Sequence, residues 1–142
     1  MDLIGLLEVE HAVLKTHFYY LQQLPDDVAW RELERIHEFL IKVHARMEDL
    51  YVFPLFPEKV VHPFSADHKL IESFGNNILR ERERRRIERY IATVIYHNDH
   101  EESDLFPLVK RPLEIRLDVI NEYGVDKYKK FTGLDPSKLP QL

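Results

Sequence analysis

The chain contains no cysteine among its 142 residues. Without thiols it cannot form a disulfide, a thiolate nucleophile, a cysteine-ligated zinc site or an iron–sulfur cluster. Histidine and carboxylate side chains are the remaining strong ligands, and the chain has eight histidines and 25 acidic residues. Any metal that this protein binds must therefore be held by nitrogen and oxygen atoms.

Other features are also scarce. No apolar run approaches the ~18 residues that a membrane span needs. The first residues, MDLIGLLEVEHAVL, lack the basic and long apolar regions of a signal peptide. The net charge is −5 and the pI is near 5.9, which does not suit a protein that coats nucleic acid or anionic lipid. We therefore expect a soluble cytoplasmic protein with neither nucleic acid nor membrane as a partner.

What the chain does have is helical periodicity. Hydrophobic residues make up 44% of the chain, and the chain contains only four glycines. This composition favours a folded helical protein. Apolar residues recur at spacings of three and four in the segments between prolines. We predict helices at 2–23, 28–56, 64–82 and 84–108 and a shorter one near 113–122. From Val125 onward we expect a loosely ordered tail with one helical turn before Gly133.

Each of the four long stripes carries a histidine at an inward position: His11, His44, His68 and His97. The midpoints between consecutive members of this set fall within LPDDV, FPLFP and RERERRR, which are all turn-like. If the chain reverses at each midpoint, the equal rise on both arms places all four histidines at one height. The sequence thus predicts an all-α, up-down-up-down four-helix bundle in residues 1–110, followed by a C-terminal extension in residues 111–142.

An internal repeat supports this arrangement. HARMEDLYVFP (44–54) and HNDHEESDLFP (97–107) share a His, a Glu four residues later, a second acid and a Phe-Pro pair. EHAVL (10–14) and DHKLI (67–71) share an acid followed by a lone His. Residues four apart lie on the same face of a helix, so Glu48 and Glu101 can each join the histidine that precedes it. The chain looks like a duplicated helical hairpin with one His and one His-xxx-Glu in each copy.

Four histidines and two glutamates make a plausible set for two metal ions, because a carboxylate can bridge two ions and an imidazole cannot readily do so. Nitrogen and oxygen ligation suits iron or manganese, with zinc possible. Two six-coordinate ions with two bridging carboxylates and one bridging solvent keep about two positions open, where a small molecule could bind. Glu72, four residues after His68, could fill one of them.

These elements, from residue 3 to 109, resemble the hemerythrin-like (HHE cation-binding) family. The resemblance implies a non-haem di-iron site with an oxo or hydroxo bridge that binds or senses dioxygen, nitric oxide or peroxide. Its terminal ligands would be His11, His44, His68 and His97, and its bridges Glu48 and Glu101. Oxygen carriers of the family have a second histidine on the third helix, where this chain has Glu72. This difference argues against reversible oxygen transport as the function. The carriers also commonly place an acid where this chain has Glu102, but Glu101 lies on the inward stripe and is favoured.

The sequence leaves several roles open. Glu72, His37, His17 and Glu102 are candidates for additional ligands or for residues that support a ligand. His17 and His37 are nearly level and could meet about 10 Å from the metals, either as a channel or extra metal position or as hydrogen-bonded histidines of the bundle end. Glu10 and Asp67 are expected to orient a histidine or to face solvent.

The function is open as well. A small-molecule binder or sensor competes with an enzyme that reduces peroxide or oxidises a small substrate. A third possibility is iron storage or delivery through a protein partner at the tail. The arginine-rich segment RERERRRIER (80–89) is expected to be a solvated turn.

Overall fold

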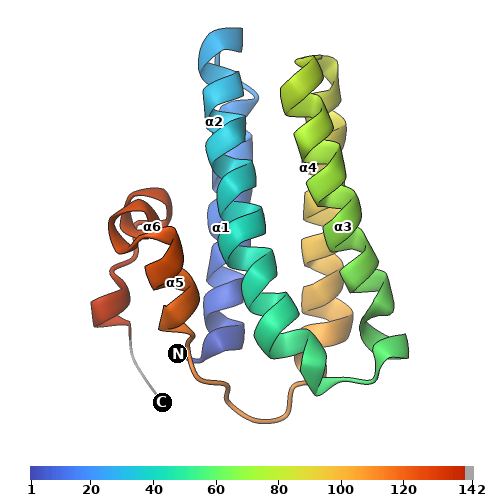
Figure 1. Ribbon diagram of the computed structural model, residues 1–142, viewed down its shortest axis with the longest axis vertical. Coiled ribbons are helices and arrows are strands. Elements are labelled where there is room, and N and C mark those ends of the chain that lie inside the picture. Colours follow the sequence, from blue (N-terminus) through green and yellow to red (C-terminus); the bar gives the residue numbers. More distant parts are fainter. Residues whose placement is uncertain (140–142) are drawn as a thin grey trace.

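The computed structural model of the chain describes residues 1–139 and shows four long helical segments that pack side by side (Figure 1). The first hairpin consists of α1 (Leu3–Leu21) and α2 (Asp26–Phe39). The second consists of α3 (Glu58–Glu81) and α4 (Arg85–His100). Within residues 1–139 there is no strand. The predicted all-α four-helix bundle is confirmed.

The second and fourth segments continue beyond α2 and α4 as π-helical turns followed by 3₁₀ turns. After α2 the chain forms π-helical turns at Leu40–Ala45 and Glu48–Val52 and then a 3₁₀ turn at Phe53–Leu55. After α4 it forms a π-helical turn at Glu101–Leu105 and a 3₁₀ turn at Phe106–Leu108. The two copies of the sequence repeat therefore end in the same unusual way. Short π-helical stretches often occur at functional sites.

The second and third reversals lie where the histidine spacing predicts, whereas the first lies a few residues earlier, because the midpoint between His11 and His44 falls inside α2. The first hairpin turns between Leu21 and Asp26, and the second between Glu81 and Arg85. Arg82 ends α3 in the left-handed conformation, with φ of 54°. Arg84 joins the two hairpin tips, because its guanidinium donates to the carbonyl oxygens of Leu21 and Gln22 and pairs with Asp26 at 2.9 Å. The arginine-rich segment is thus in part a tie between the hairpins.

Two predictions about the helices were wrong. The third helix begins at Glu58, with Pro57 at its N-cap, rather than at residue 64. Pro63 lies inside this helix and removes one backbone donor, but Val61 and Phe64 beside it are buried in the core, which offsets the loss. The tail is more ordered than predicted. It forms α6 (Val125–Thr132), which ends at Gly133 in the left-handed conformation, and buries Tyr128 and Phe131.

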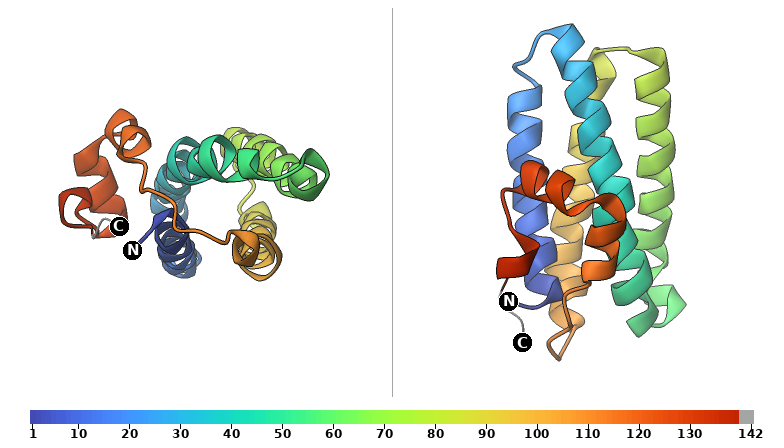
Figure 2. Two further views of the ribbon diagram at one scale, coloured as in Figure 1. Left: turned by 90° about the horizontal axis from the view of Figure 1, so that it is seen from below. Right: turned by 60° about the vertical axis from the view of Figure 1, so that its left-hand side comes forward.

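The C-terminal extension packs against one side of the bundle. It contains α5 (Leu117–Tyr123), α6 and a 3₁₀ turn at Pro136–Lys138. These elements lie beside α1 and α2 and away from α3 and α4 (Figures 1 and 2). The chain leading to them is fixed to the N-terminus, because the Leu3 N–H donates to the carbonyl oxygen of Leu113 at 2.8 Å. The first hairpin is therefore covered on a side where the second is not.

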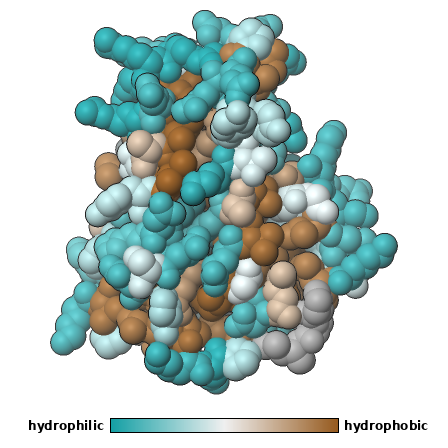
Figure 3. Space-filling view, turned by 180° about the vertical axis from the view of Figure 1, so that it is seen from behind, coloured by the Kyte–Doolittle hydropathy of each residue, from teal (hydrophilic) through white to brown (hydrophobic). Residues whose placement is uncertain are grey.

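The apolar stripes meet in one core that includes side chains from all four segments and from the extension. Seen from behind, the surface is mostly hydrophilic around the hairpin tips, and hydrophobic side chains gather lower down (Figure 3). No helix in residues 1–139 combines the length and the apolar character needed to cross a bilayer. What interrupts the apolar core is a layer of buried histidine and glutamate side chains.

Candidate metal centre

Six polar side chains meet in the middle of the bundle, one or two from each long segment. Their residues have relative exposures between 0% and 8%. They are the six that the sequence predicts: His11, His44, Glu48, His68, His97 and Glu101. In the second hairpin His68 lies 13 residues before the end of α3 and His97 lies 12 residues after the start of α4, so nearly equal arms bring this pair level. In the first hairpin the corresponding arms have 10 and 18 residues, so equal arms do not account for the matched heights there.

The six side chains form two groups that share both glutamates. His11 and His44 belong to one group, His68 and His97 to the other, and Glu48 and Glu101 to both. Within each group the possible ligand atoms lie within 4.8 Å of one another. Two atoms that each lie about 2.1 Å from one ion are separated by roughly 3 to 4 Å, so each group has the dimensions of a metal site.

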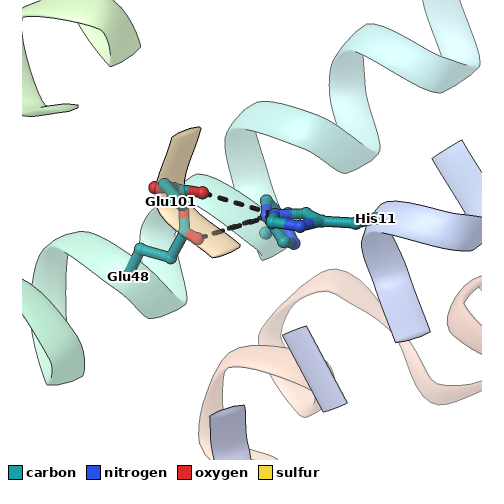
Figure 4. A group of neighbouring side chains, drawn as sticks. His11, Glu48 and Glu101 are labelled. Atoms are coloured by element: carbon teal, nitrogen blue, oxygen red, sulfur yellow. Dashed lines mark ion pairs between the residues drawn. The ribbon is translucent and has the colours of Figure 1, made fainter. Parts of the chain in front are cut away.

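Each glutamate presents one oxygen to each group. Glu48 Oε2 lies 3.4 Å from His44 Nε2, and Glu48 Oε1 lies 3.0 Å from His68 Nε2. Glu101 Oε1 lies 3.3 Å from His11 Nε2, and Glu101 Oε2 lies 3.1 Å from His97 Nε2. Figure 4 shows the two carboxylates side by side and both directed toward His11. This is the arrangement that two bridging carboxylates require.

The buried polar atoms at this centre have no hydrogen-bond partner among the residues described. They comprise the Nε2 atoms of the four histidines and all four oxygens of Glu48 and Glu101. Leaving one such atom unpaired in a protein interior costs roughly 1–3 kcal/mol, and here eight occur together. All are lone-pair donors of the kind that iron, manganese or zinc accepts. The residues present thus fit a pair of metal ions.

Each histidine is held from behind by a carboxylate at its other ring nitrogen. Nδ1 lies 2.6 to 3.0 Å from one acidic oxygen in every case. Such bonds fix the ring orientation and the tautomer that leaves Nε2 free. The four pairs are His11–Glu102, His44–Glu10, His68–Asp49 and His97–Asp67.

These four acids follow the sequence repeat. The acid before each lone His reaches across its own hairpin, so that Glu10 holds His44 and Asp67 holds His97. The acid after each shared Glu reaches the other hairpin, in the pairs Asp49–His68 and Glu102–His11. The expectation that Glu10 and Asp67 orient a histidine is confirmed. Asp49 was missed, although its place in the repeat, equivalent to that of Glu102, is a signal that could have identified it.

The repeated Phe-Pro pair also contributes to the centre. In each π-helical turn, the carbonyl oxygen of the shared glutamate accepts a bond from the N–H five residues later, which belongs to Phe53 or Phe106. The Phe53 ring then stacks on His68 at 5.0 Å, and the Phe106 ring stacks on His11 at 5.6 Å. In the sequence these phenylalanines stand out only as part of the repeated Phe-Pro pair. In the structure each covers a lone histidine.

The histidines and glutamates of the centre shift one another's pKa values toward the charged forms. Burial lowers the pKa of His44, but the charge of Glu48 and the bond to Glu10 outweigh burial and raise this pKa to about 10. Burial raises the pKa of Glu101, but the surrounding histidines outweigh it and hold this pKa well below its usual value. Nearby carboxylates also raise the pKa of the two remaining shifted histidines against the effect of burial (His68, His97). A metal ion would therefore displace protons from this cluster.

The additional candidates do not join either group. Glu72 is exposed and lies outside both sets of ligand atoms, and Glu102 meets His11 through Nδ1 rather than Nε2. His17 and His37 do not pair with each other. His17 Nε2 donates to the carbonyl oxygen of Phe131 at 2.9 Å.

His37 has partners from the second hairpin. It accepts from the Tyr90 hydroxyl at 2.6 Å through Nδ1 and lies 3.2 Å from the Asn76 side-chain oxygen through Nε2. The structure therefore favours the hydrogen-bonded interpretation of both histidines over an extra metal position.

Comparison with known families agrees with this geometry. The model of the hemerythrin HHE cation-binding domain matches residues 2–109, which include all six side chains of the centre and end before α5. No curated protein and no solved structure gives a significant match. The protein is a metal-binding domain with buried histidine and glutamate clusters, and the chain belongs to the hemerythrin HHE cation-binding family.

Proposed function

We propose that this protein holds two iron ions and binds or senses dioxygen, or a related small molecule such as nitric oxide or peroxide. The four inward histidines would be the terminal ligands and the two shared glutamates the bridges: His11, His44, His68, His97, Glu48 and Glu101. One observation carries the proposal. Each shared carboxylate presents one oxygen to each histidine pair, an arrangement that would hold two ions as a pair rather than at two separate sites.

The composition of the centre favours a ligand-binding ion pair over a closed structural site. Each group offers two imidazoles and one oxygen from each of two carboxylates, which is fewer donors than a six-coordinate ion takes. An iron pair bound here would supply electrons and open positions to dioxygen, nitric oxide or peroxide. The residues of the chain hold the ions together, orient the imidazoles and exclude bulk water.

The approach to the centre lies on the side of His68. Glu48 and Glu101 are fully buried, whereas His68 is 8% exposed. His68 lines two surface pockets, of about 460 and 580 Å³, which both also include Asp49 and Glu72. Phe53, stacked on the ring, lines the larger one. His11 is 5% exposed and lines a smaller pocket of about 210 Å³, so the side of His68 offers the wider approach.

The same pockets support a second candidate function, an enzyme that reduces peroxide or oxidises a small substrate at the pair. Both pockets are far larger than a diatomic molecule requires. Steady consumption of peroxide with turnover would favour the enzyme. Binding of one equivalent that ends when the pair is filled would favour the binder or sensor.

The deciding experiment measures metal content and optical spectra of the purified protein before and after anaerobic reduction. We expect about two iron ions per chain and a spectrum that changes on reduction and again on exposure to dioxygen or nitric oxide. Glu72→Ala is the matched control, because this exposed acid lies near His68 but outside both groups. Purified chain that takes up no iron under reducing conditions would overturn the proposal.

A further inference from the structure

One route of hydrogen bonds connects the C-terminal extension to the centre. The Tyr128 hydroxyl, in α6, donates to Glu10 Oε2 at 2.7 Å. The other oxygen of Glu10 lies 2.8 Å from His44 Nδ1, and His44 Nε2 faces Glu48 Oε2. Tyr128, Glu10 and His44 are each at most 1% exposed, so bulk water does not compete for these bonds.

The three other carboxylates that hold histidines are in a different environment. The side chains of Asp49, Asp67 and Glu102 are 49%, 36% and 39% exposed. Water can supply a second hydrogen bond to each of them. Glu10 is fully buried and receives its second bond from a tyrosine of the extension instead.

The extension is fixed in the place that this bond requires. Phe39 in α2 packs on the rings of Tyr128 and Phe131, with ring centres 5.9 and 4.3 Å apart. The His17 ring stacks on Phe131 at 4.1 Å and bonds its carbonyl oxygen. Lys127 pairs with Glu38. These contacts hold α6 against the first hairpin, as the right-hand view in Figure 2 shows.

We propose that the extension is part of the metal centre and that Tyr128 is a positioning residue that holds Glu10 against His44, which makes the two ion positions unequal. The inference rests on the proposed pair of metal ions but not on their redox chemistry. The family match ends at residue 109, so Tyr128 lies outside the segment that the family model describes. The ion beside His11 and His44 is held by a ligand with a buried, fully bonded support. The ion beside His68 and His97 is not.

Removing the Tyr128 hydroxyl leaves a buried oxygen of Glu10 without a donor, so Glu10 loses its preferred position against His44. Loss of a residue that supports a metal ligand typically weakens metal binding 10–100-fold. Tyr128 is one bond further away, so we expect about a tenfold effect. That effect should fall on one ion only, whereas a general loosening of the fold would weaken both.

The test uses the full chain loaded with Mn²⁺ as the probe and compares wild type with Tyr128→Phe. Tyr123→Phe is the matched control, since its ring packs on the same Phe39 at 6.0 Å but its hydroxyl is not bonded to Glu10. Release to a chelator is followed by electron paramagnetic resonance, which distinguishes coupled pairs from isolated ions. Wild type should release its two ions in a fast and a slow phase. After the fast phase and before the slow phase, chains that hold one isolated ion should accumulate.

Tyr128→Phe should accelerate the slow phase about tenfold and leave the fast phase unchanged. Tyr123→Phe should release both ions as wild type does. The inference is overturned if the two variants behave alike. It is also overturned if wild type releases both ions in a single phase, and this second measurement does not depend on whether a variant folds. If wild type binds no metal at all, the proposed function itself fails, and that outcome is distinct from equal release of two bound ions.

Discussion

The two helical hairpins are nearly equivalent at the metal centre and differ away from it. At the centre, each contributes a lone histidine, a His-xxx-Glu pair, two supporting acids and a stacked phenylalanine. Seven residues beyond the lone histidines the equivalence ends, because the first hairpin has Phe18 and the second has Gly75. The extension then covers the first hairpin alone (Figure 1). The residues of the metal centre are therefore repeated in both hairpins, whereas the residues away from the centre differ between the two hairpins.

The difference between Phe18 and Gly75, on the first helix of each hairpin, is accompanied by a second difference on the other helix of each hairpin. His37 and Tyr90 stand at equivalent places, each seven residues before the histidine of a His-xxx-Glu pair, and are bonded to each other. Phe18 packs edge-on against Tyr90, with ring centres 6.1 Å apart. A Cβ atom at Gly75 would lie only 2.2 Å from His37 Cε1. The glycine thus gives the space that the histidine ring occupies.

The largest expected effect breaks the centre that both hairpins share. Because each glutamate presents oxygens to both groups, Glu101→Ala and Glu48→Ala should each remove both ions rather than one. We expect metal affinity to fall by more than the roughly 100-fold that marks the loss of a supporting residue. Metal analysis after gel filtration measures the ions per chain. One retained ion in either variant would show that the sites are independent.

A smaller effect separates the supports of the two hairpins. Glu10→Gln changes a fully buried support of His44, and Asp67→Asn changes a 36% exposed support of His97. Both substitutions preserve shape but remove the negative charge and one acceptor oxygen, and water can compensate for that change only at the exposed site. We expect an affinity loss of about 100-fold for the first variant and about tenfold for the second. Competition titration with a coloured chelator measures both, and equal losses would contradict the asymmetry.

Much of this comparison could be predicted from the sequence. The bundle, the level histidines and the six central residues follow from periodicity and from spacing, which are local or arithmetic properties. The partners of the ring nitrogens could not be assigned to particular acids. That pairing depends on which helix faces which, so Asp49 was missed and Glu10 was matched to no particular histidine. Tyr128 lies 118 residues from Glu10, and no repeat or spacing connects a tail tyrosine to a buried acid.

A change at Gly75 tests the divergent part of the hairpins without touching the centre. Gly75→Ala should destabilise the protein by about 1–3 kcal/mol, because the methyl group meets the His37 ring. Gly5→Ala is the matched control, since a Cβ atom there meets its nearest neighbour at an ordinary 3.4 Å. It should be neutral or stabilising by up to about 1 kcal/mol. Urea unfolding of the metal-free chain measures both, and combining Gly75→Ala with His37→Ala should recover part of the loss.

The last expected effect concerns protons at the centre and builds up gradually with pH. In the metal-free chain, burial lowers the pKa of His44, yet Glu48 and Glu10 raise it to about 10, while the usual value is about 6.5. The folded state then binds this proton more tightly than the unfolded state. Its stabilisation is fully present below about pH 6.5 and is lost as the pH rises toward 10, by at most about 1.4 kcal/mol per pH unit for each proton.

Metal binding requires the free Nε2 atom, so the loaded protein should show the opposite trend. Thermal unfolding between pH 6.5 and 9 should therefore give a falling Tm for the metal-free chain and a widening gap between loaded and metal-free Tm. His100→Gln is the control, because this half-exposed side chain pairs with Asp104 outside both groups and should leave the gap unchanged. A gap that stays constant with pH would mean that the ions displace no protons, and the raised pKa of His44 would then have no part in metal binding.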